Sequence, residues 1–329
     1  MRSPITIVIP VYNRAHTIGR TLRSIDAQSV KPAHIIIVDN ESTDSSLSII
    51  NTWASGRPDV TVLSEPRRGA SIARNRGLRE VTTEWTMFFD SDDEMLPSHI
   101  EDYTRAISEH PAADILGRDI ILRFINGSTR RLYFHSGRDN MFHHIFRATL
   151  STQRYIARTS LFRSVGGWNE SLLGWNDYEL GVRLLLTSPV TVNIGGKPSV
   201  HTHQLKDSIS GLLACDNHPL WERAIDTIRS IIKSLPESCR ERDSYLYWLD
   251  ARAVLLAATY EHEARQSTSP EFKEMAHRLA RDLYSRTVDS SPAPHFMLRA
   301  IYRHNIIFGR LSWLLARIPV SANYPPPII

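Results

Sequence analysis

The first 100 residues alternate between short apolar runs and segments with helical periodicity, and no other feature limits the fold as strongly. Apolar runs of this length predict strands, and apolar residues that recur every three or four positions predict helices. Strands that are apolar along their whole length and separated by helices indicate a mostly parallel sheet covered on both faces. Ligands of such sheets bind outside the carboxyl ends of the strands. The predicted strands are 5–11, 35–38, 60–63 and 85–89, and the predicted helices are 17–25, 45–54 and 69–80.

The rest of the chain changes character twice. From about residue 115 to 200 the pattern loosens into short strands and turns, with a hairpin turn at Asn126-Gly127 and a helix at 177–187. Beyond Asn217 the sequence becomes strongly helical, with segments at 219–235, 242–265, 271–288 and 296–317. The expected organisation is an α/β domain over 1–212 (halves at about 1–100 and 101–212), a helical C-terminal region over 213–318 and a Pro-rich tail over 319–329.

Composition narrows the class of protein. Lys and Arg outnumber Asp and Glu by 39 to 35, and this small excess favours anionic partners such as diphosphate or lipid headgroups. No basic run is interleaved with aromatic residues, so we expect no nucleic-acid partner. Two cysteines, Cys215 and Cys239, fit a reducing compartment. Because the chain shows neither a cleavable leader nor an apolar stretch of the roughly 20 residues that span a bilayer, we expect a cytoplasmic protein, soluble or peripheral on the inner face of the membrane.

The apolar run at 87–89 ends in three carboxylates within four residues, Asp90, Asp92 and Asp93. Charge gathered at the end of a buried strand is costly unless a cation neutralises it, and carboxylate oxygens suit Mg²⁺ or Mn²⁺. Asp90 and Asp92 point the same way in extended backbone because they are two residues apart. The alternative is that Asp93 or Ser91 caps a helix around 96–98 and the other carboxylates are solvated.

Polar residues also follow the first two predicted strands. Asp39 lies just past a buried strand, where its carboxylate would accept a hydrogen bond from a nucleobase N–H. Pro10 and Tyr12 would contact the base or the ribose. For residues 42–44 the alternative is an ordinary turn rich in capping residues.

Arginines surround the segment 69–73, at Arg67, Arg68, Arg74 and Arg76. An arginine that faces the ligand edge would pair with a diphosphate through its planar fork, whereas arginines on other helical faces are solvated. We expect Arg74 to be the inward one.

Asp177 and Glu179 lie near a predicted helix start, after a loop that carries Trp168 and Trp175. A carboxylate in this place suits a general base beside a sugar, because indole rings stack on the apolar faces of sugars. The competing explanation for Asp177 is a helix-terminal charge favoured by the macrodipole.

Two histidines, His201 and His203, alternate along a predicted strand or loop. They would face one site as metal or phosphate ligands, although single histidines are usually structural.

Four ordered motifs resemble glycosyltransferase family 2, whose members are inverting, nucleotide-sugar-dependent enzymes of the GT-A fold. The likeness covers about residues 4–211, where Gly166-Gly167-Trp168 and the segment from Asp177 extend it, and the helical remainder has no comparable resemblance. The motifs are IVIPVYN at 7–13, VDNESTD at 38–44, Gly69 with ARNRG at 73–77, and FDSDD at 89–93.

The resemblance implies roles for individual residues. Asp92 and His203 would hold the metal, although His201 competes with His203, and Asp177 would deprotonate the acceptor hydroxyl. One direct displacement at the anomeric carbon then gives inversion. Trp168 and Trp175 are the expected acceptor contacts. The implied donor-binding residues are Pro10, Tyr12, Asn13, Asp39, Arg74, Asp90, Ser91 and Asp92.

The chain departs from the family pattern at two places. Where members often carry an acidic pair at the base position, this chain has Asn176-Asp177, which leaves Asp177 as the sole obvious base and Glu179 as a weaker substitute. Where the second motif commonly carries Asp-Gly, this chain has Asn40-Glu41, which puts a bulkier residue near the base pocket and weakens the assignment of the nucleotide. Uridine diphosphate is still the first nucleotide that the resemblance implies.

The predicted helix at 296–317 is apolar with arginines, and no Asp or Glu follows Asp289. Such a helix would lie on an anionic membrane, or pack on its own domain or on a partner subunit.

These observations predict a metal-dependent (Mn²⁺ or Mg²⁺) inverting glycosyltransferase that moves a sugar from a nucleoside diphosphate sugar to a hydroxyl of a glycan or lipid-linked acceptor. A second hypothesis is a catalytically silent nucleotide-sugar-binding or scaffold protein, in which Asn176 reflects lost catalysis. A third is a phosphatase or nucleotidyltransferase that uses Asp90 and Asp92.

Overall fold

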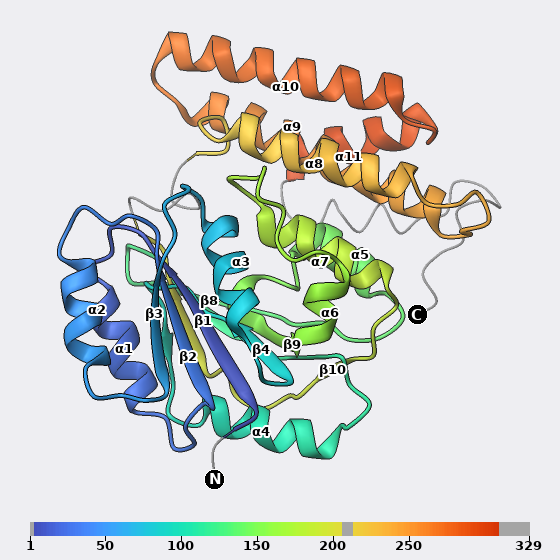
Figure 1. Cartoon of the computed structure of the whole chain (residues 1–329). Helices are drawn as coiled ribbons and strands as arrows, with labels where there is room; N and C mark the ends of the chain where they lie inside the picture. The colour runs from blue at the N-terminus through green and yellow to red at the C-terminus, as the bar shows by residue number, and fades with distance from the viewer. Residues whose placement is uncertain (1–2, 206–212, 309–329) are drawn as a thin grey trace. The chain divides into compact units, whose positions relative to one another are not determined.

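The computed structural model describes residues 3–205 and 213–308, which fold as two compact units (Figure 1). The first unit comprises 3–137 and 149–205, and the second comprises 138–148 and 213–308. Segment 138–148, which the sequence placed in the first domain, therefore belongs to the helical unit.

A seven-stranded sheet forms the centre of the first unit, in the order β10-β6-β9-β4-β1-β2-β3. The four predicted strands form its contiguous parallel part, while β9 runs antiparallel to both β4 and β6. The strands are β1 (Ile5–Val11), β2 (His34–Asp39), β3 (Val60–Ser64), β4 (Trp85–Phe88), β6 (Ile115–Gly117), β9 (Tyr155–Arg158) and β10 (Thr191–Asn193).

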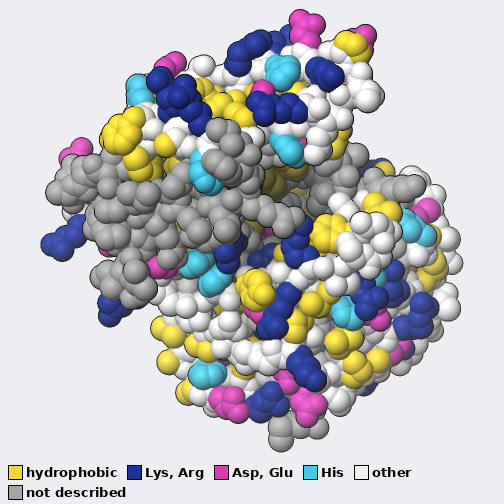
Figure 2. Space-filling model, turned by 180° about the vertical axis from the view of Figure 1, so that it is seen from behind, with side chains coloured by type: hydrophobic (Ala, Val, Ile, Leu, Met, Phe, Trp, Pro, Cys, Tyr) yellow, Lys and Arg dark blue, Asp and Glu magenta, His cyan; other side chains and the backbone are white. Residues whose placement is uncertain are grey.

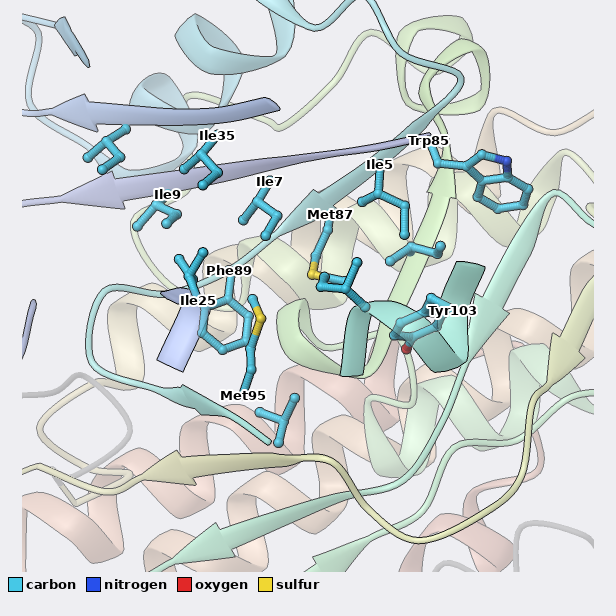
Figure 3. Packing of buried hydrophobic residues seen from close by; sticks show 14 of the residues in the cluster. Ile5, Ile7, Ile9, Ile25, Ile35, Trp85, Met87, Phe89, Met95 and Tyr103 are labelled. Carbon is cyan, nitrogen blue, oxygen red and sulfur yellow. The ribbon is translucent and has the colours of Figure 1, made fainter. Parts of the chain in front are cut away.

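Helices cover both faces of this sheet, so the core has two layers. One layer packs α1 (Ile18–Asp26), α2 (Ser46–Ala54) and α4 (His99–Glu109) on the β1 face that carries Ile5, Ile7 and Ile9; Figure 3 shows these isoleucines beside Met87, Phe89 and Tyr103. The opposite layer packs α3 (Ala70–Glu80), α6 (Thr159–Ser164) and α7 (Asn176–Leu186). Between β4 and α7 the chain also forms the 3₁₀ turn η1 (Thr152–Arg154).

Helix α3 approaches the sheet closely because residue 77 is glycine. A Cβ built at Gly77 would lie 2.4 Å from Val8 Cγ1 and 3.3 Å from Val38 Cγ2. Real Cβ atoms do not come so close to branched side chains, so any other residue would push α3 away from β1 and β2.

A second, four-stranded sheet has the order β5-β11-β7-β8. Its hairpin turns at Asn126-Gly127, as predicted, and Gly127 has a φ of 83°. Strand β11 pairs with β7 on one side and, on the other, with β5, the segment that follows the acidic cluster. The strands are β5 (Glu94–Met95), β7 (Ile120–Arg123), β8 (Thr129–Leu132) and β11 (Val200–His203).

The second unit is helical and is built around α9 (Arg242–Gln266), which packs against the other four helices. These are α5 (Asn140–Arg147), α8 (His218–Lys233), α10 (Pro270–Ser290) and α11 (His295–Phe308). The predicted helix at 296–317 is described only as far as Phe308, and its remainder and the tail at 319–329 lie outside the described residues. Among the helices of residues 3–205 and 213–308, none is long and apolar enough to cross a membrane.

Candidate functional site

The carboxyl ends of β1, β2 and β4 lie side by side at one edge of the large sheet. Val11 is in register with Asp39, and Asp39 with Ser64. The Phe89 N–H donates to the Val8 carbonyl at 3.0 Å, which brings the start of the acidic cluster to the end of β1. The three polar segments that the sequence singled out therefore share one edge.

Hydrogen bonds join the loops after β1 and β2. The Asn13 N–H donates to Ser42 Oγ at 3.0 Å, and the Thr43 N–H donates to Asn13 Oδ1 at 2.8 Å. The Ala15 N–H donates to Asp44 Oδ2 at 3.0 Å. The side chains of residues 42–44 thus shape this loop, as the turn alternative expected, and the Asn13 amide oxygen is used by the loop as well.

Only one of the two carboxylate oxygens of Asp39 has a hydrogen-bond partner among the described residues. Its side chain is 4% exposed, and Oδ2 accepts the Ser42 N–H at 3.3 Å. Oδ1 is buried and has no hydrogen-bond partner among the described residues. Because a buried acceptor without a donor is costly, Oδ1 suits an N–H group of a bound molecule.

Tyr12 offers an aromatic ring at the same edge. The ring is 43% exposed, and the Arg68 guanidinium lies 4.0 Å from its centroid. Arg68 Nε is 3.8 Å from Glu41 Oε2, and Glu41 has a left-handed φ of 60°.

Asn40 is a structural residue that the sequence interpretation missed. Its amide group donates to the carbonyls of Glu65 and Arg67 at 2.7 and 2.8 Å. Its amide oxygen accepts the Gly69 N–H at 2.8 Å. Asn40 therefore ties the end of β2 to the turn that leads into α3.

Arg74 points inward, as expected, and is 6% exposed. Its Nη2 donates to Asp90 Oδ1 at 2.7 Å, while Nε and Nη1 are buried without hydrogen-bond partners in the described part of the chain. Two guanidinium nitrogens with unused N–H donors next to a carboxylate cluster suit diphosphate oxygens.

The expectation that Trp168 contacts an acceptor sugar is wrong for this structure, because its side chain is 2% exposed. Its ring packs edge-on against Phe88 at 5.1 Å between centroids, and the Arg74 guanidinium lies 4.4 Å from its centre. Trp168 therefore supports Arg74 from inside the core. Trp175 is half-buried, with its ring 5.2 Å from that of Tyr178, and its acceptor role stays a prediction.

The acidic cluster brings together ligand atoms of Asp90, Asp92 and Asp93 within 4.8 Å of one another. Burial and the charge of Asp90 raise the pKa of Asp92 to about 6, although Arg14, 3.5 Å away, opposes the rise. Burial and the two neighbouring carboxylates raise the pKa of Asp93 well above its usual range. A divalent cation would favour the ionised forms of this group, so the donor set fits Mg²⁺ or Mn²⁺.

The members of the cluster differ in their contacts. Both oxygens of Asp90 are held, one by Arg74 and the other by the side-chain amide of Gln153, a residue that the sequence interpretation missed. Asp93 Oδ1 accepts the His203 N–H at 2.9 Å. Neither Asp93 nor Ser91 caps the next helix, because α4 begins after Ser98. Asp92 is thus the best placed of the three to hold a metal.

His203 contacts the acidic cluster through its backbone N–H, which donates to Asp93. Its ring Nε2 lies 3.8 Å from Glu94 Oε2, and burial together with Arg20 lowers its pKa, which favours the neutral imidazole. The ring is outside the carboxylate group described above. His201 is in register with Glu94 on β5, and burial lowers its pKa too. Metal ligation by His203 stays a prediction.

Asp177 lies in the first turn of α7, close enough to the acidic cluster for the charge of Asp90 to act on its carboxylate. Burial raises its pKa, Arg74 and Arg154 oppose the rise, and Asp90 adds to it. Asp177 Oδ1 accepts the Tyr178 N–H at 2.8 Å, which leaves Oδ2 as the oxygen that can take a proton.

Glu179, two residues further on, is engaged elsewhere. Its side chain is 1% exposed, and its two oxygens accept Nε and Nη2 of Arg183, both at 2.7 Å. Arg183 also donates to the carbonyls of Val165 and Gly167. Glu179 is therefore a structural carboxylate and does not substitute for Asp177 as a base.

Comparison with known proteins shows which family the first part of the chain resembles. The family model described as "Glycosyl transferase family 2" matches residues 6–164. This segment belongs to glycosyltransferase family 2. The family domain contains every donor-side residue from Pro10 to Asp92, whereas Trp168, Asp177 and His203 lie beyond its end.

Curated relatives of the family 2 domain are similar over part of their length. The uncharacterized glycosyltransferase YibD of Escherichia coli is 35% identical over 97 residues, 30% of this chain and 28% of that protein. The glycosyltransferase GlyA of Streptococcus pneumoniae is 29% identical over 142 residues, 43% of this chain and 20% of GlyA. The PGL/p-HBAD biosynthesis glycosyltransferase Rv2957 of Mycobacterium tuberculosis is 26% identical over 180 residues, 54% of this chain and 68% of that protein. The chain thus matches about a quarter of the length of the first two.

Among solved structures, TarS residues 1–349 of S. aureus in complex with UDP-GlcNAc gives a TM-score of 0.69. The two chains are 18% identical, and the match covers 95% of this chain and 89% of that one. This likeness confirms the GT-A fold that the sequence predicted for the family 2 domain.

Proposed function

We propose that this protein is a metal-dependent inverting glycosyltransferase that moves a sugar from a nucleoside diphosphate sugar to a hydroxyl of a glycan or lipid-linked acceptor. One observation carries the proposal: the charges of Arg74 and of Asp90, which are bonded to each other, both act on Asp177. A single carboxylate base would therefore lie beside the residues proposed to bind the donor diphosphate. Family membership of residues 6–164 supports the same chemistry.

The donor side is argued from three groups. The free Oδ1 of Asp39 would accept the N–H of uracil, and the exposed ring of Tyr12 would stack on the base. The two unpartnered nitrogens of Arg74, Nε and Nη1, would donate to diphosphate oxygens. Asp90, whose oxygens are held by Arg74 and Gln153, would orient that arginine and contact the ribose.

Asp92 would hold the divalent cation, with His203 as a second ligand. When bound there, the cation would supply positive charge opposite the departing nucleoside diphosphate. The like charges gathered in this cluster support a cation at this place.

Asp177 would take the proton of the acceptor hydroxyl through Oδ2, because Oδ1 is occupied by the Tyr178 N–H. One base is enough for a single displacement at the anomeric carbon. A single displacement inverts the configuration there.

Titration calorimetry with UDP, with and without Mn²⁺, tests the donor site, and a panel of nucleotide sugars tests turnover. TarS, whose structure holds UDP-GlcNAc, shares the fold, and this makes UDP-GlcNAc the first donor to try. We expect metal-dependent binding and release of the nucleoside diphosphate. Binding without turnover would support the catalytically silent module, and absence of metal-dependent nucleotide binding would refute both hypotheses.

Peripheral contact with an anionic membrane is a separate proposal for α11. Its exposed residues include Phe296, 65% exposed, and the arginines Arg299 and Arg303. On the face shown in Figure 2, the Lys and Arg side chains are scattered and do not form one patch. Flotation with phosphatidylglycerol vesicles should be lost in Arg299→Glu/Arg303→Glu. Equal flotation of both proteins would refute the proposal.

A further inference from the structure

Asn176 stands directly before the proposed base, at a position where the family often carries an acid. We propose that Asn176 is a positioning residue, which fixes the first turn of α7, and with it Asp177, to helix α3 through Ser71. The inference rests on the proposed function, and it gives Asn176 a role in turnover instead of marking lost catalysis.

The side chain of Asn176 bonds to helix α3 on one side and to the backbone of Asp177 on the other. Its Nδ2 donates to Ser71 Oγ at 3.0 Å, across 105 residues of sequence. Its Oδ1 accepts the Asp177 N–H at 2.9 Å. Ser71 is buried in the first turn of α3, one turn before Arg74. The asparagine thus links the helix that carries the base to the helix that carries the diphosphate-facing arginine.

The donor capacity of an amide matters at this position. Ser71 Oγ accepts from Asn176, which leaves the Ser71 hydroxyl proton free to donate to the Leu172 carbonyl at 3.4 Å. An ionised carboxylate can only accept hydrogen bonds, so the Ser71 hydroxyl would donate to it and no longer to the Leu172 carbonyl. The side chain of Asn176 therefore suits this chain of bonds, whereas the family's acid would break one member of it.

The start of α7 depends on these bonds. Trp175 precedes the helix in a left-handed conformation, with φ of 50°, and caps no N–H with its side chain. The first N–H groups of a helix lack partners within the helix. Here Asn176 Oδ1 holds the Asp177 N–H, and Asp177 Oδ1 holds the Tyr178 N–H. Removing the first bond frees the backbone of the base itself.

Charge gives a second reason for a neutral side chain. Asp177 already faces Arg74 of α3, Arg154 of η1 and Asp90 after β4, and it faces the Tyr155 hydroxyl of β9. An acid at 176 would add a like charge directly beside the base. Asparagine provides the two hydrogen bonds without that charge.

Steady-state kinetics on the full chain test the proposal, with release of UDP from UDP-GlcNAc, or from the panel donor that wild type turns over. Asn176→Ala should lower kcat by about tenfold and leave the donor KM within about twofold, because the loss is one of orientation. Ser71→Ala should lower kcat by a smaller factor. The double variant should be no worse than Asn176→Ala, since both substitutions remove the same link.

Asn193→Ala is the matched control. Asn193 also donates with its amide, to the Phe134 carbonyl at 3.0 Å, and accepts a backbone N–H, from Gly195 at 2.9 Å, but on the distant strand β10. Its loss should leave kcat unchanged. An Asn176→Ala variant with wild-type kcat, or with a raised donor KM as its only defect, would overturn the positioning role.

Hydrogen exchange decides the question without catalysis. In Asn176→Ala the amides of 172–180 should exchange faster than in wild type, whereas in Asn193→Ala they should not. Unchanged exchange in this segment would overturn the proposal. If wild type turns over no nucleotide sugar, the proposed function fails, and exchange still shows whether Asn176 holds the turn.

Discussion

The two units of the molecule bury carboxylates in opposite ways. In the helical unit Asp250 is fully buried and is bonded by Arg229 and by the Ser291 hydroxyl. In the first unit Asp92 and the buried Asp93 lie against each other and against Asp90, and burial and like charge together raise the pKa values of Asp92 and Asp93. Burial alone therefore does not mark a functional carboxylate. The informative feature is a buried charge whose partners within the chain do not match it.

The largest effect should come from Asp177→Asn. If Asp177 is the base, turnover falls about a thousandfold, while UDP affinity changes little because the base would contact the acceptor hydroxyl and not UDP. Kinetics and calorimetry on the same preparation measure both quantities.

Glu179→Gln is the matched control, because it alters a carboxylate that Arg183 already holds. It should change stability and leave Asp177 in place. Near wild-type turnover of Asp177→Asn would remove this residue as the base.

Next in size is Arg229→Ala in the helical unit. Because this change leaves Asp250 charged and buried without its cation, the free energy of unfolding should fall by about 3–5 kcal/mol. Denaturant titration measures the loss, and UDP affinity in the folded protein should be retained. A loss under about 1 kcal/mol would show that this unit tolerates unmatched charge, and the comparison would fail.

Asp92→Asn should weaken metal-dependent UDP binding without lowering the stability of the metal-free protein. Metal-dependent UDP affinity should fall about a hundredfold, since the cluster loses a ligand oxygen that carries charge. Without metal the protein should be at least as stable as wild type, because one of three like charges is gone. Destabilisation of the metal-free variant would contradict this account of the cluster.

The smallest effect concerns pH. Burial raises the pKa of Asp177, and the base acts only when ionised, so kcat should rise with pH through a value above the usual range of aspartate. Below that value kcat should fall tenfold for each pH unit. A profile at saturating Mn²⁺ and donor measures it, and a flat profile between about pH 4 and 8 would contradict the assignment.

The sequence predicts the first half of the sheet well because strands β1 to β4 are apolar along their length and alternate with amphipathic helices. Strand β9 was not predicted. It has four residues, and its antiparallel place between β4 and β6 depends on partners far along the chain.

The site was predictable where residues follow strand ends. Asp39, Asp90 and Asp92 stand at positions that any parallel sheet brings together. Asn40, Gln153 and Ser71 were missed because their bonds join segments 25 to 105 residues apart, and no local pattern encodes such pairs.

Trp168 shows the reverse error. An aromatic residue in a glycine-rich loop resembles an exposed sugar-stacking ring. Gly167, with φ of 71°, instead turns the chain so that Trp168 enters the core beneath Arg74. Local composition suggested exposure, and tertiary packing decided against it.

Helix α5 makes the helical unit discontinuous in the chain, and this limits how the protein can be divided. Its side chains Met141, Phe142 and Ile145 are buried, and the helix packs against α9, where Phe142 meets Trp248 at 5.2 Å between ring centroids. During synthesis α5 emerges about a hundred residues before that partner. A cut near residue 207 would leave an apolar helix uncovered in the middle of the sequence of the first unit. A separable version needs both segments removed and Gly137 rejoined to Thr149 by a short linker.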